Sequence, residues 1–342
     1  MATHPLTEFL ARLVRHENLT REQAFELLEA LLDPEATDAQ ISGALVALAA
    51  KGETVEELTG MAEGLRSRAV RVLCQHPCFI DTAGTGSSRA KTFNISTAAA
   101  FVIAGAGVPV AKHGNRAASS KSGSADLLTA LGVNVSAIPL VSENALNEFG
   151  ICFMFAPLYH GATARVAGIR RQLGIHTTFN LLGPLSNPAG APRQIIGVWH
   201  KDLAEKLARV LSGLGTERAW VVHGDDGLDE ITLAGTTHVA EAQNGEVKTF
   251  EITPQDFGFE VGTIEHLRGG DADANAEIVG AVLAGERHDE ARALVIMNAA
   301  AALFLGGAAG DLREAAKIAA HAIDSGEARR KLELLIEATS GP

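Results

Sequence analysis

The first seventy residues have the apolar spacing of short amphipathic helices. Three capping boxes of the form Thr-x-x-Gln/Glu begin at Thr20, Thr37 and Thr54, and an apolar run with helical spacing follows each of them. Pro34 and Gly52 separate these runs. Together with a helix over residues 6–15, the pattern predicts a small bundle of four short helices.

From Phe79 onward, short apolar runs that suit buried parallel strands alternate with helical stretches. The expected strands cover residues 79–82, 108–111, 151–155, 195–199, 219–222, 238–242 and 248–252. The expected helices cover residues 96–105, 122–131, 142–149, 162–173, 201–214, 273–283, 290–305 and 311–325. This alternation predicts an α/β fold with a mainly parallel central sheet.

The change of pattern also predicts two domains. A small all-helical domain would occupy residues 1–72, joined by helices from about 162–190, and a large α/β domain would occupy residues 73–342. Apolar residues make up 46% of the chain and charged residues 20%, so a large buried core is expected. The apolar stretch 293–310 contains Asn298 and is rich in Ala and Gly, which favours a buried helix ending near Gly306 over a membrane span.

Charge and cysteine content restrict the function and the location. The net charge is −12, so the chain has no general attraction for nucleic acid or for an anionic membrane. Cys74, Cys78 and Cys152 are too few and odd in number for a disulfide framework, and they predict reduced thiols. The N-terminal residues mix charged and apolar types, which predicts no signal peptide. A cytoplasmic location is therefore expected.

Two glycine-containing loops follow expected strands. The first runs from Asp81 to Ser88, and the sequence Asn94-Ile-Ser-Thr then opens a helix. Glycines let backbone N–H groups converge on an anion, and a helix start adds unpaired donors. Ser96 or Thr97 would serve equally well as a plain helix cap.

The second loop, residues 112–124, is denser in polar side chains. It carries three cations, four serines and two glycines within an acidic protein. A loop at the carboxyl end of a strand lies where α/β folds bind ligands, so this composition favours phosphate over a solvated basic turn.

An acidic turn and an arginine pair complete the candidate chemistry. The turn Asp225-Asp226-Gly-Leu-Asp229-Glu230 suits Mg²⁺ shared with substrate phosphates, although acidic surface turns are common. Arg170 and Arg171 end a helix, where they would either bind a carboxylate or complement the helix dipole. His160 is expected to start that helix, as a wall residue or a polar contact.

These motifs, in this order, resemble the anthranilate phosphoribosyltransferase family over essentially the whole chain. The resemblance is carried by Asn94-Ile-Ser-Thr, Lys112-His-Gly-Asn-Arg through Ser124-Ala-Asp126, Asn180-Leu-Leu-Gly-Pro, Gly227-Leu-Asp-Glu, Gly269-Gly-Asp and Asn298-Ala-Ala-Ala. It implies the fold shared with pyrimidine nucleoside phosphorylases, usually as a homodimer. The implied reaction is transfer of the phosphoribosyl group from phosphoribosyl pyrophosphate to the amine of anthranilate, in tryptophan biosynthesis.

The resemblance also implies roles for individual residues. Gly84 would contact both substrates, Asn115 and Arg170 would hold anthranilate, and Ser96, Asp229 and Glu230 would bind two Mg²⁺ ions. The implied contacts of the phosphoribosyl donor are Thr92, Asn94, Ile95, Ser96, Thr97, Lys112, His113, Gly114, Asn115, Arg116, Ala117, Ala118, Ser119, Ser120 and Ser124. No side chain stands out as a general base, and His113 is the nearest candidate in the sequence.

One departure from the family pattern affects the first loop. The family usually reads Gly-Thr-Gly-Gly-Asp, whereas this chain reads Gly84-Thr-Gly-Ser87-Ser88, which puts the donor contacts of Ser87 and Ser88 in question. Two alternatives stay open: a pyrimidine nucleoside phosphorylase of the same fold, and a non-catalytic paralogue that binds nucleic acid. The lysine-containing loop argues against the first, and the acidic net charge argues against the second.

Overall fold

A helical bundle at the N-terminus is followed by an α/β body in the computed structural model, which describes residues 4–86, 92–117, 121–265 and 267–341. The bundle consists of α1 (Pro5–Leu13), α2 (Arg21–Leu32), α3 (Asp38–Lys51) and α4 (Val55–Arg68). All three predicted capping boxes are confirmed, since Thr20, Thr37 and Thr54 each accept a hydrogen bond from the backbone N–H three residues later.

The cap of α3 allows a simple stability test. Thr37 Oγ1 accepts the Gln40 N–H at 3.2 Å. We expect Thr37→Ala to lower the free energy of unfolding by about 1 kcal/mol, because one N–H at the helix start loses its partner. Thr37→Ser keeps the hydroxyl and should unfold in urea almost as the unmodified protein does. Equal losses for the Ala and Ser variants would show that the hydroxyl cap contributes nothing.

One seven-stranded sheet forms the centre of the α/β body, in the order β3-β2-β1-β4-β5-β6-β7. Its strands are β1 (Ile80–Gly84), β2 (Val110–Gly114), β3 (Ile151–Phe155), β4 (Arg193–Gly197), β5 (Arg218–Gly224), β6 (Thr237–Gln243) and β7 (Glu246–Ile252). The strands from β3 to β5 are parallel, and β6 and β7 are added antiparallel. The predicted mainly parallel sheet is confirmed.

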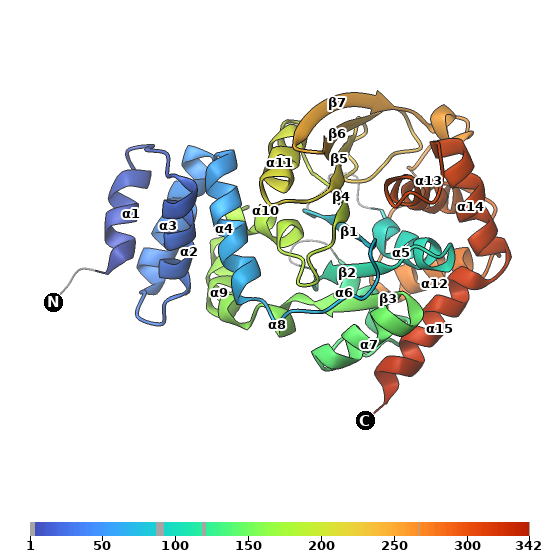
Figure 1. Ribbon diagram of the computed structural model, residues 1–342, viewed down its shortest axis with the longest axis horizontal. Helices are drawn as coiled ribbons and strands as arrows, with labels where there is room; N and C mark the ends of the chain where they lie inside the picture. Colours follow the sequence, from blue (N-terminus) through green and yellow to red (C-terminus); the bar gives the residue numbers. More distant parts are fainter. Residues whose placement is uncertain (1–3, 87–91, 118–120, 266, 342) are drawn as a thin grey trace.

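Helices cover both faces of the sheet (Figure 1). They are α5 (Ile95–Gly105), α6 (Ser124–Ala130), α7 (Pro139–Phe149), α8 (Ala156–Tyr159), α9 (Ala164–Leu173), α10 (Thr178–Leu185), α11 (Asp202–Gly213), α12 (Ala272–Leu283), α13 (Glu290–Leu305), α14 (Leu312–Asp324) and α15 (Glu327–Ser340). Short 3₁₀ turns lie at Gly161–Thr163 and Pro254–Phe257. The sequence analysis did not predict α8 or α15, and it expected α10 only within the helices from about 162–190, without bounds of its own.

Several element ends differ from the predicted ones. β1 and β2 run on to Gly84 and Gly114, because these glycines stay in parallel register with Gly197 and Phe155. His160 directly follows α8 and precedes the 3₁₀ turn Gly161–Thr163, which continues into α9, so α9 itself begins four residues after His160. α13 ends at Leu305, as expected, and is buried along most of its length. Among the described residues, no helix combines the length and apolar character that crossing a membrane requires.

The two faces of the sheet belong to two hydrophobic cores. Neighbouring residues alternate between them: Ile195 and Val222 face the core built with α5 and α13, whereas Ile196 and Val221 face the other. This second core also contains the buried side chains of α2, α3 and α4. The bundle and the face of the sheet that carries Ile196 and Val221 therefore share one continuous apolar interior.

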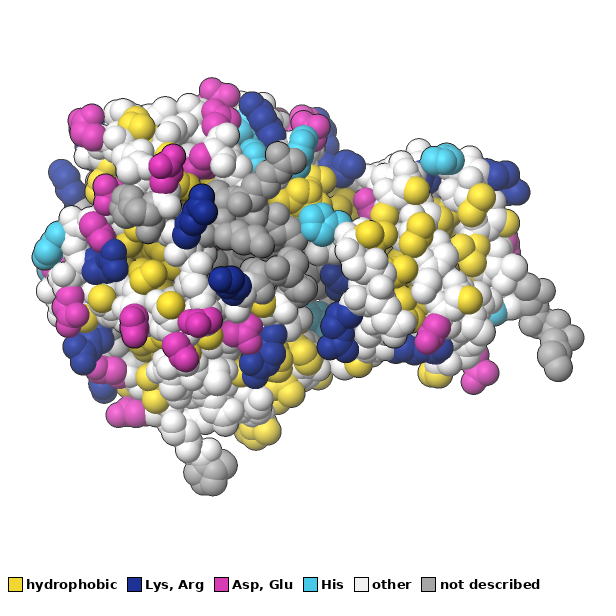
Figure 2. All heavy atoms as spheres, turned by 180° about the vertical axis from the view of Figure 1, so that it is seen from behind, with side chains coloured by type: hydrophobic (Ala, Val, Ile, Leu, Met, Phe, Trp, Pro, Cys, Tyr) yellow, Lys and Arg dark blue, Asp and Glu magenta, His cyan; other side chains and the backbone are white. Residues whose placement is uncertain are grey.

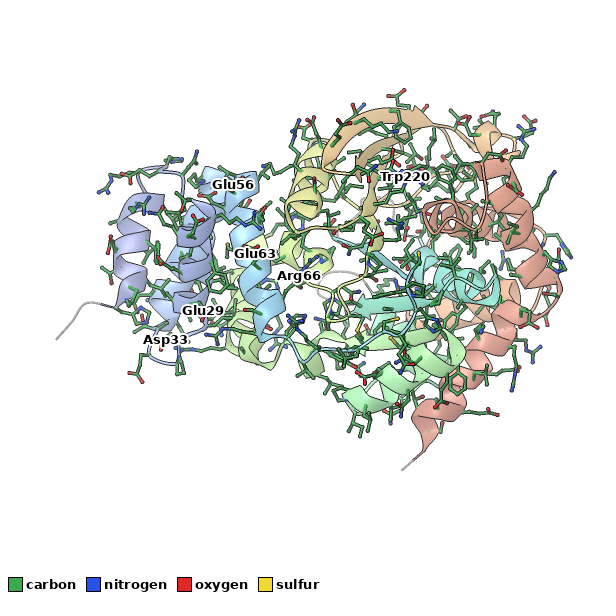
Figure 3. All side chains as sticks on the ribbon, viewed as in Figure 1. Glu29, Asp33, Glu56, Glu63, Arg66 and Trp220 are labelled. Carbon is green, nitrogen blue, oxygen red and sulfur yellow. The ribbon has the colours of Figure 1, made fainter. Side chains whose placement is uncertain are left out.

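Polar contacts add to this packing where the bundle meets the body. Arg66 extends from α4 toward α10 (Figure 3), and its Nε donates to the Leu185 carbonyl at 2.7 Å. Lys206 Nζ donates to the Glu53 carbonyl at 2.9 Å. Burial lowers the pKa of Arg66 to about 10, so its guanidinium keeps its charge at neutral pH. Seen from behind, the bundle projects from one end of the larger body (Figure 2).

Candidate active site

The candidate residues follow strands that end at one edge of the sheet. Two of the candidate segments are the loops that follow β1 and β2, and the first of these leads into the N-terminus of α5. The third is the acidic turn that follows β5. All three strands are parallel, so these segments lie at the carboxyl ends of the strands. In α/β sheets, ligands bind in the crevice outside these carboxyl ends. Ser87, Ser88, Ala118, Ser119 and Ser120 lie outside the described residues.

The N-terminus of α5 meets the acidic turn directly. The Ser96 backbone N–H donates to Glu230 Oε1 at 3.1 Å. Ile95 and Thr97 are each about 1% exposed, so a ligand would reach these two residues through their backbone. The helix start therefore supplies N–H donors at the place where the turn supplies a carboxylate.

Asn94, the residue before α5, is held by its neighbours. Its Oδ1 accepts from Asn275 Nδ2 at 3.0 Å, and its Nδ2 donates to the Ser122 carbonyl at 3.4 Å. Asn275 Oδ1 in turn accepts the Gly270 N–H at 2.8 Å. The Gly269-Gly-Asp motif and α12 thus fix the segment that begins α5, and Thr92 pairs with Arg268 in an isolated antiparallel bridge.

Lys112 lies buried between the first loop and α5. Its Nζ donates to the Thr82 carbonyl and lies 3.4 Å from Ser96 Oγ, and the residue is only 4% exposed. Burial lowers the pKa of Lys112, while the negative charges of Asp81 and Glu230 partly oppose that shift. An ammonium group is thereby placed beside the donors at the start of α5.

Asp81 lies in β1, the strand next to the one that contains Lys112. It is fully buried, and its Oδ1 accepts the His113 N–H at 3.2 Å. Burial raises the pKa of Asp81 to about 6, and the charge of Lys112 acts in the opposite direction. The sequence analysis included Asp81 in the first loop without giving it a role.

Asp229 and Glu230 form the acidic pair of the turn after β5. Burial raises the pKa of Glu230 to about 8, and the neighbouring charge of Asp229 adds to the shift. The pair is packed tightly: a Cβ placed on Gly197 would lie only 1.6 Å from the Asp229 carbonyl oxygen. A Cβ on Gly84 would lie 3.5 Å from Asp229 Oδ2, so the first loop reaches the acids.

The other two acids of this turn behave differently. Asp226 accepts from Thr232 Oγ1 at 2.5 Å and from the Leu228 N–H at 3.1 Å, so its carboxylate closes the turn. Asp225 is exposed. Within the predicted acidic turn, Asp229 and Glu230 thus lie beside Gly84 and the start of α5, whereas Asp226 contacts its own turn.

The oxygen donors of this pair suit a hard divalent cation. Two adjacent, partly buried carboxylates repel each other, and a bound cation removes that repulsion. Ser96 adds a hydroxyl beside them. No group of three or more His, Cys, Asp or Glu side chains suited to a metal lies within the described ranges. Two carboxylates and a hydroxyl fit Mg²⁺, which commonly completes its coordination with water and substrate phosphates.

Asp126 organises the second loop. Its carboxylate accepts the N–H groups of Ala117 and Gly123, each at 2.9 Å, and pairs with Arg116 at 2.8 Å. A Cβ on Gly123 would come within 2.4 Å of the Ala117 nitrogen, so this close approach requires glycine. Asn115, Arg116 and Lys121 are exposed, and Ser124 Oγ donates to the Asn115 carbonyl at 3.3 Å.

Arg170 contacts two residues of α10. Its NH2 donates to Asn180 Oδ1 at 3.0 Å, and its guanidinium lies 5.6 Å from the centre of the Phe179 ring. Arg170 Nε is buried and has no hydrogen-bond partner. Burial lowers the pKa of Arg170. Its neighbour Arg171 is exposed.

Two buried histidines lie near the other end of α10. The rings of His113 and His160 are 5.1 Å apart, and the Nε2 atom of each is buried without a partner. Burial lowers the pKa of His113 to about 3, with His160 adding to the shift and the Gly183 backbone opposing it. Burial also lowers the pKa of His160. Both rings are therefore neutral at pH 7.

This burial makes the stability of the fold depend on pH. The folded-state pKa of His113 lies below its unfolded value of about 6.5. Above that pH the ring is neutral in both states, so burying it does not lower the free energy of unfolding. Each pH unit below about 6.5 should remove up to about 1.4 kcal/mol, until the pH nears the folded pKa. We expect His113→Gln, which cannot titrate, to show a flatter dependence of the unfolding free energy on pH. Parallel curves for the two proteins between pH 7 and pH 5 would contradict this expectation.

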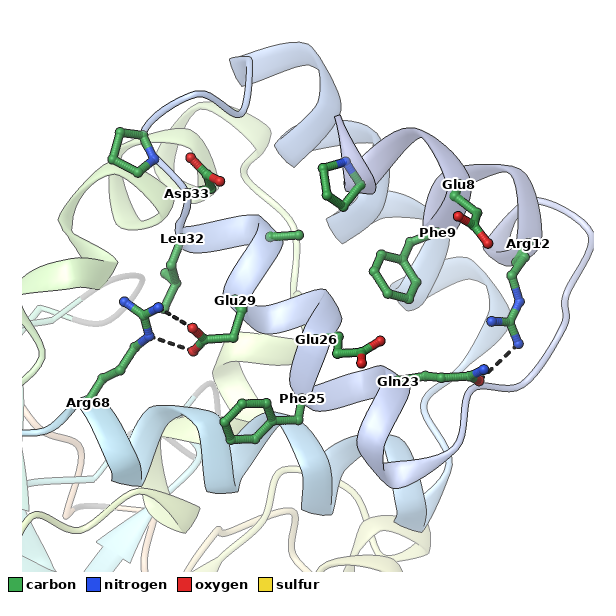
Figure 4. Close-up of a pocket in the computed structure, with 13 residues that line it drawn as sticks. Glu8, Phe9, Arg12, Gln23, Phe25, Glu26, Glu29, Leu32, Asp33 and Arg68 are labelled. Atoms are coloured by element: carbon green, nitrogen blue, oxygen red, sulfur yellow. Dashed lines mark hydrogen bonds and ion pairs between the residues drawn. The ribbon is translucent and has the colours of Figure 1, made fainter. Parts of the chain in front are cut away.

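A separate hollow lies in the helical bundle. It has a volume of about 680 Å³ and is lined mainly by α1 and α2 (Figure 4). Both arginines on its wall are already engaged, Arg68 with Glu29 and Arg12 with Gln23. This hollow is therefore not a second anion site comparable to the loops at the sheet edge.

Comparison with known proteins matches this arrangement to one family. The glycosyl transferase family models match twice, the helical bundle domain over residues 7–69 and the a/b domain over residues 76–329. Anthranilate phosphoribosyltransferase from Moorella thermoacetica is 49% identical over 96% of both chains. The protein of that name from Anaeromyxobacter dehalogenans is 51% identical over 97% of this chain and 98% of its own. The chain belongs to the anthranilate phosphoribosyltransferase family.

Solved structures of the anthranilate phosphoribosyltransferase family agree with the fold. The one from Thermus thermophilus has a TM-score of 0.91 and 37% identity, over 97% of this chain and 99% of that chain. The family member from Saccharomyces cerevisiae, in complex with PRPP and Mg, has a TM-score of 0.90 and 28% identity over 99% of both chains. The same yeast protein with 4-fluoroanthranilate has a TM-score of 0.88 and 27% identity over 98% of both chains.

Proposed function

We propose that this chain transfers the phosphoribosyl group of phosphoribosyl pyrophosphate (PRPP) to the amine of anthranilate. The products are N-(5-phosphoribosyl)anthranilate and pyrophosphate, and the reaction belongs to tryptophan biosynthesis. The observation that carries the proposal is the contact of Glu230 with the start of α5, beside Lys112. It brings anion donors, an ammonium group and an acid that suits a metal ion to one place. The yeast relative binds PRPP and Mg, the two ligands that such a site suits.

The donor site would be formed by α5 and the two loops. We assign the phosphates to the N–H groups of residues 94–97, to Lys112 and to the loop that Asp126 holds in shape. Gly84, which lies beside Asp229, would contact both substrates. The remaining proposed contacts are Thr92, His113, Gly114, Asn115, Arg116, Ala117 and Ser124, together with Ser87, Ser88, Ala118, Ser119 and Ser120 beyond the described residues.

Asp229, Glu230 and Ser96 would hold two Mg²⁺ ions together with the pyrophosphate oxygens. When bound, Mg²⁺ spreads the negative charge that develops on the departing pyrophosphate. The chain's own part is to keep both carboxylates in place, through the tight packing of Asp229 on Gly197 and the Ser96–Glu230 bond. Lys112 offers a further fixed positive charge nearby.

Anthranilate would bind between Arg170 and the second loop. The unpartnered Nε of Arg170 gives a carboxylate a charge-assisted partner, and Asn115 is exposed at the loop. The unpartnered Nε2 atoms of the neutral His113 and His160 would offer further polar contacts to anthranilate. The yeast relative was solved with 4-fluoroanthranilate, which has the same carboxylate and amine.

The reaction needs little acid–base help from the chain. The aromatic amine of anthranilate is neutral at pH 7 and attacks without prior loss of a proton. The barrier therefore lies in the departure of pyrophosphate and in the positive charge that develops on the ribose. Holding the amine opposite the anomeric carbon would supply several kcal/mol, out of about 7–11 kcal/mol for well-oriented partners. We assign no general base, and His113 stays the nearest candidate.

Three measurements distinguish this function from the two alternatives. We expect consumption of anthranilate that requires both PRPP and Mg²⁺ and that stops when EDTA is added. Thymidine and uridine with phosphate test the nucleoside phosphorylase alternative, and a gel shift at low salt tests nucleic-acid binding. Phosphorolysis without anthranilate turnover would overturn the proposal.

We also propose the domain division, assembly and location that the sequence suggested. Residues 1–72 and 73–342 would act as two units joined by α9 and α10, which pack against α3 and α4. The chain would form a homodimer, to be measured by light scattering during gel filtration. The three free thiols support a cytoplasmic location.

A further inference from the structure

The buried helix α13 contains one polar side chain within an otherwise apolar stretch. From Ala293 to Leu305, every residue other than Asn298 is apolar, and Asn298 is only 4% exposed. A buried amide destabilises a fold unless its polar atoms are hydrogen-bonded. The contacts of Asn298 therefore indicate why it stands there.

Asn298 binds both polar groups of a single residue in the acidic turn. Its Oδ1 accepts the Ile231 N–H at 3.0 Å, and its Nδ2 donates to the Ile231 carbonyl at 3.0 Å. The same Nδ2 donates to the Leu294 carbonyl of its own helix at 2.9 Å. Ile231 is fully buried, so both of its backbone groups need a partner within the protein.

Ile231 directly follows Glu230, and this placement links Asn298 to the acidic pair. The segment between β5 and β6 contains no described helix or strand, so no regular ladder fixes its backbone. On the other side of the pair, Leu228 is 1% exposed and anchors the chain in the core. Asp229 and Glu230 are thus held from both sides, by Leu228 through packing and by Asn298 through hydrogen bonds.

We propose that Asn298 is a positioning residue that aims Asp229 and Glu230 at the metal by fixing the Ile231 backbone to α13. Asn298 itself would touch neither metal nor substrate. This inference rests on the proposed metal role of the two acids. Carboxylate ligands must stay close to one geometry to bind a metal well, and hydrogen bonds behind the ligands commonly provide that constraint.

Hydrogen exchange of the free protein tests the constraint without any metal. The Ile231 amide belongs to an irregular turn, yet we expect it to exchange as slowly as the buried amides in the middle of α13. Exchange as rapid as that of an amide without a hydrogen-bond partner would overturn the proposal even if no variant could be prepared.

Two variants at position 298 separate positioning from packing. Asn298→Ala and Asn298→Leu both remove the bonds to Ile231, but leucine is close to asparagine in size and refills the space. We expect both variants to speed exchange of the Ile231 amide at least about tenfold. Both should raise the Mg²⁺ concentration for half-maximal activity by a similar factor, with little change in the Michaelis constant for anthranilate.

Leu303→Ala is the matched control. Leu303 lies on the same helix, is fully buried and has no part in the turn, so its truncation lowers the melting temperature without freeing Ile231. The Mg²⁺ dependence of this variant should be unchanged. The proposal is wrong if Asn298→Leu keeps the normal Mg²⁺ dependence, or if Leu303→Ala shifts it equally.

The experiment also distinguishes this inference from the proposed function. If Glu230→Gln leaves the response to Mg²⁺ unchanged, the metal role of the acids fails, and the inference fails with it. If Glu230→Gln abolishes the response while Asn298→Leu does not alter it, only the positioning role fails.

Discussion

Glu230→Gln and Asp229→Asn should each reduce turnover at limiting Mg²⁺ by at least about a hundredfold. The reason is that each would remove a proposed carboxylate ligand, and metal stabilisation of a departing oxygen contributes several kcal/mol. Glu230→Gln should nevertheless fold at least as stably as the unmodified protein. Burial and the charge of Asp229 raise the pKa of Glu230 to about 8, so the ionised carboxylate is unfavourable there without a cation.

The measurement is initial velocity against Mg²⁺ concentration, with thermal unfolding measured in parallel. Asp225→Asn is a suitable control because it makes the same chemical change in the same turn at an exposed position. We expect the control to keep the normal Mg²⁺ dependence. Full activity of Glu230→Gln at limiting Mg²⁺ would remove Glu230 from the metal site.

Arg170→Ala should raise the Michaelis constant for anthranilate by about ten- to hundredfold and leave that for PRPP nearly unchanged. A hydrogen bond to a charged group contributes about 1.5–3 kcal/mol, and Arg170 Nε is buried without another partner. Arg170→Lys should recover only part of the loss, since an ammonium group has neither the Nε donor nor the planar geometry of a guanidinium.

Arg171→Ala provides the control for Arg170→Ala. Arg171 is the next residue on α9 and is exposed, so the variant loses the same charge from the same helix end without reaching the site. Steady-state kinetics with each substrate varied in turn should show a normal Michaelis constant for anthranilate. An equal rise of the Michaelis constants for both substrates in Arg170→Ala would indicate a general disturbance of α10, because Arg170 donates to Asn180 of that helix.

The features that the sequence predicted correctly depend on local patterns. The three capping boxes each act within one helical turn, and all three are present. Apart from α8 and the bounds of α10, the order of strands and helices from β1 to α14 follows from apolar runs that suit buried elements. α15 could also have been predicted, because Ala328, Leu332, Leu335 and Thr339 have helical spacing and are buried.

The bounds of α10 were not predicted, for a physical reason. Gly183 and Pro184 within Asn180-Leu-Leu-Gly-Pro are typical of a turn, yet Pro184 lies in the last turn of the helix. Proline lacks the N–H that would donate to the carbonyl four residues earlier, and α10 ends one residue after Pro184. The capping side chain of Asn180, which accepts the Thr177 N–H at 3.0 Å, was visible in the sequence as Thr177-x-x-Asn180.

The supports of the site could not be predicted from local patterns. Asn275 and Asn94 are 181 residues apart in the chain, and Asn298 and Ile231 are 67 apart. No spacing rule connects such partners, because the fold alone brings them together. One signal was available for Asn298, namely an amide within an apolar helix, but that signal does not identify the partner.

The continuous core shared by the bundle and the sheet has a consequence for evolution. The two family models meet near residues 69–76, where a genetic exchange between relatives would naturally join two coding segments. Such an exchange would pair the side chains of α2, α3 and α4 with β4, β5 and α11 from another lineage, inside one close-packed interior. Substitutions on the two sides of this interior must therefore be accepted together. The two segments are expected to be inherited as one unit, even though each matches a family model of its own.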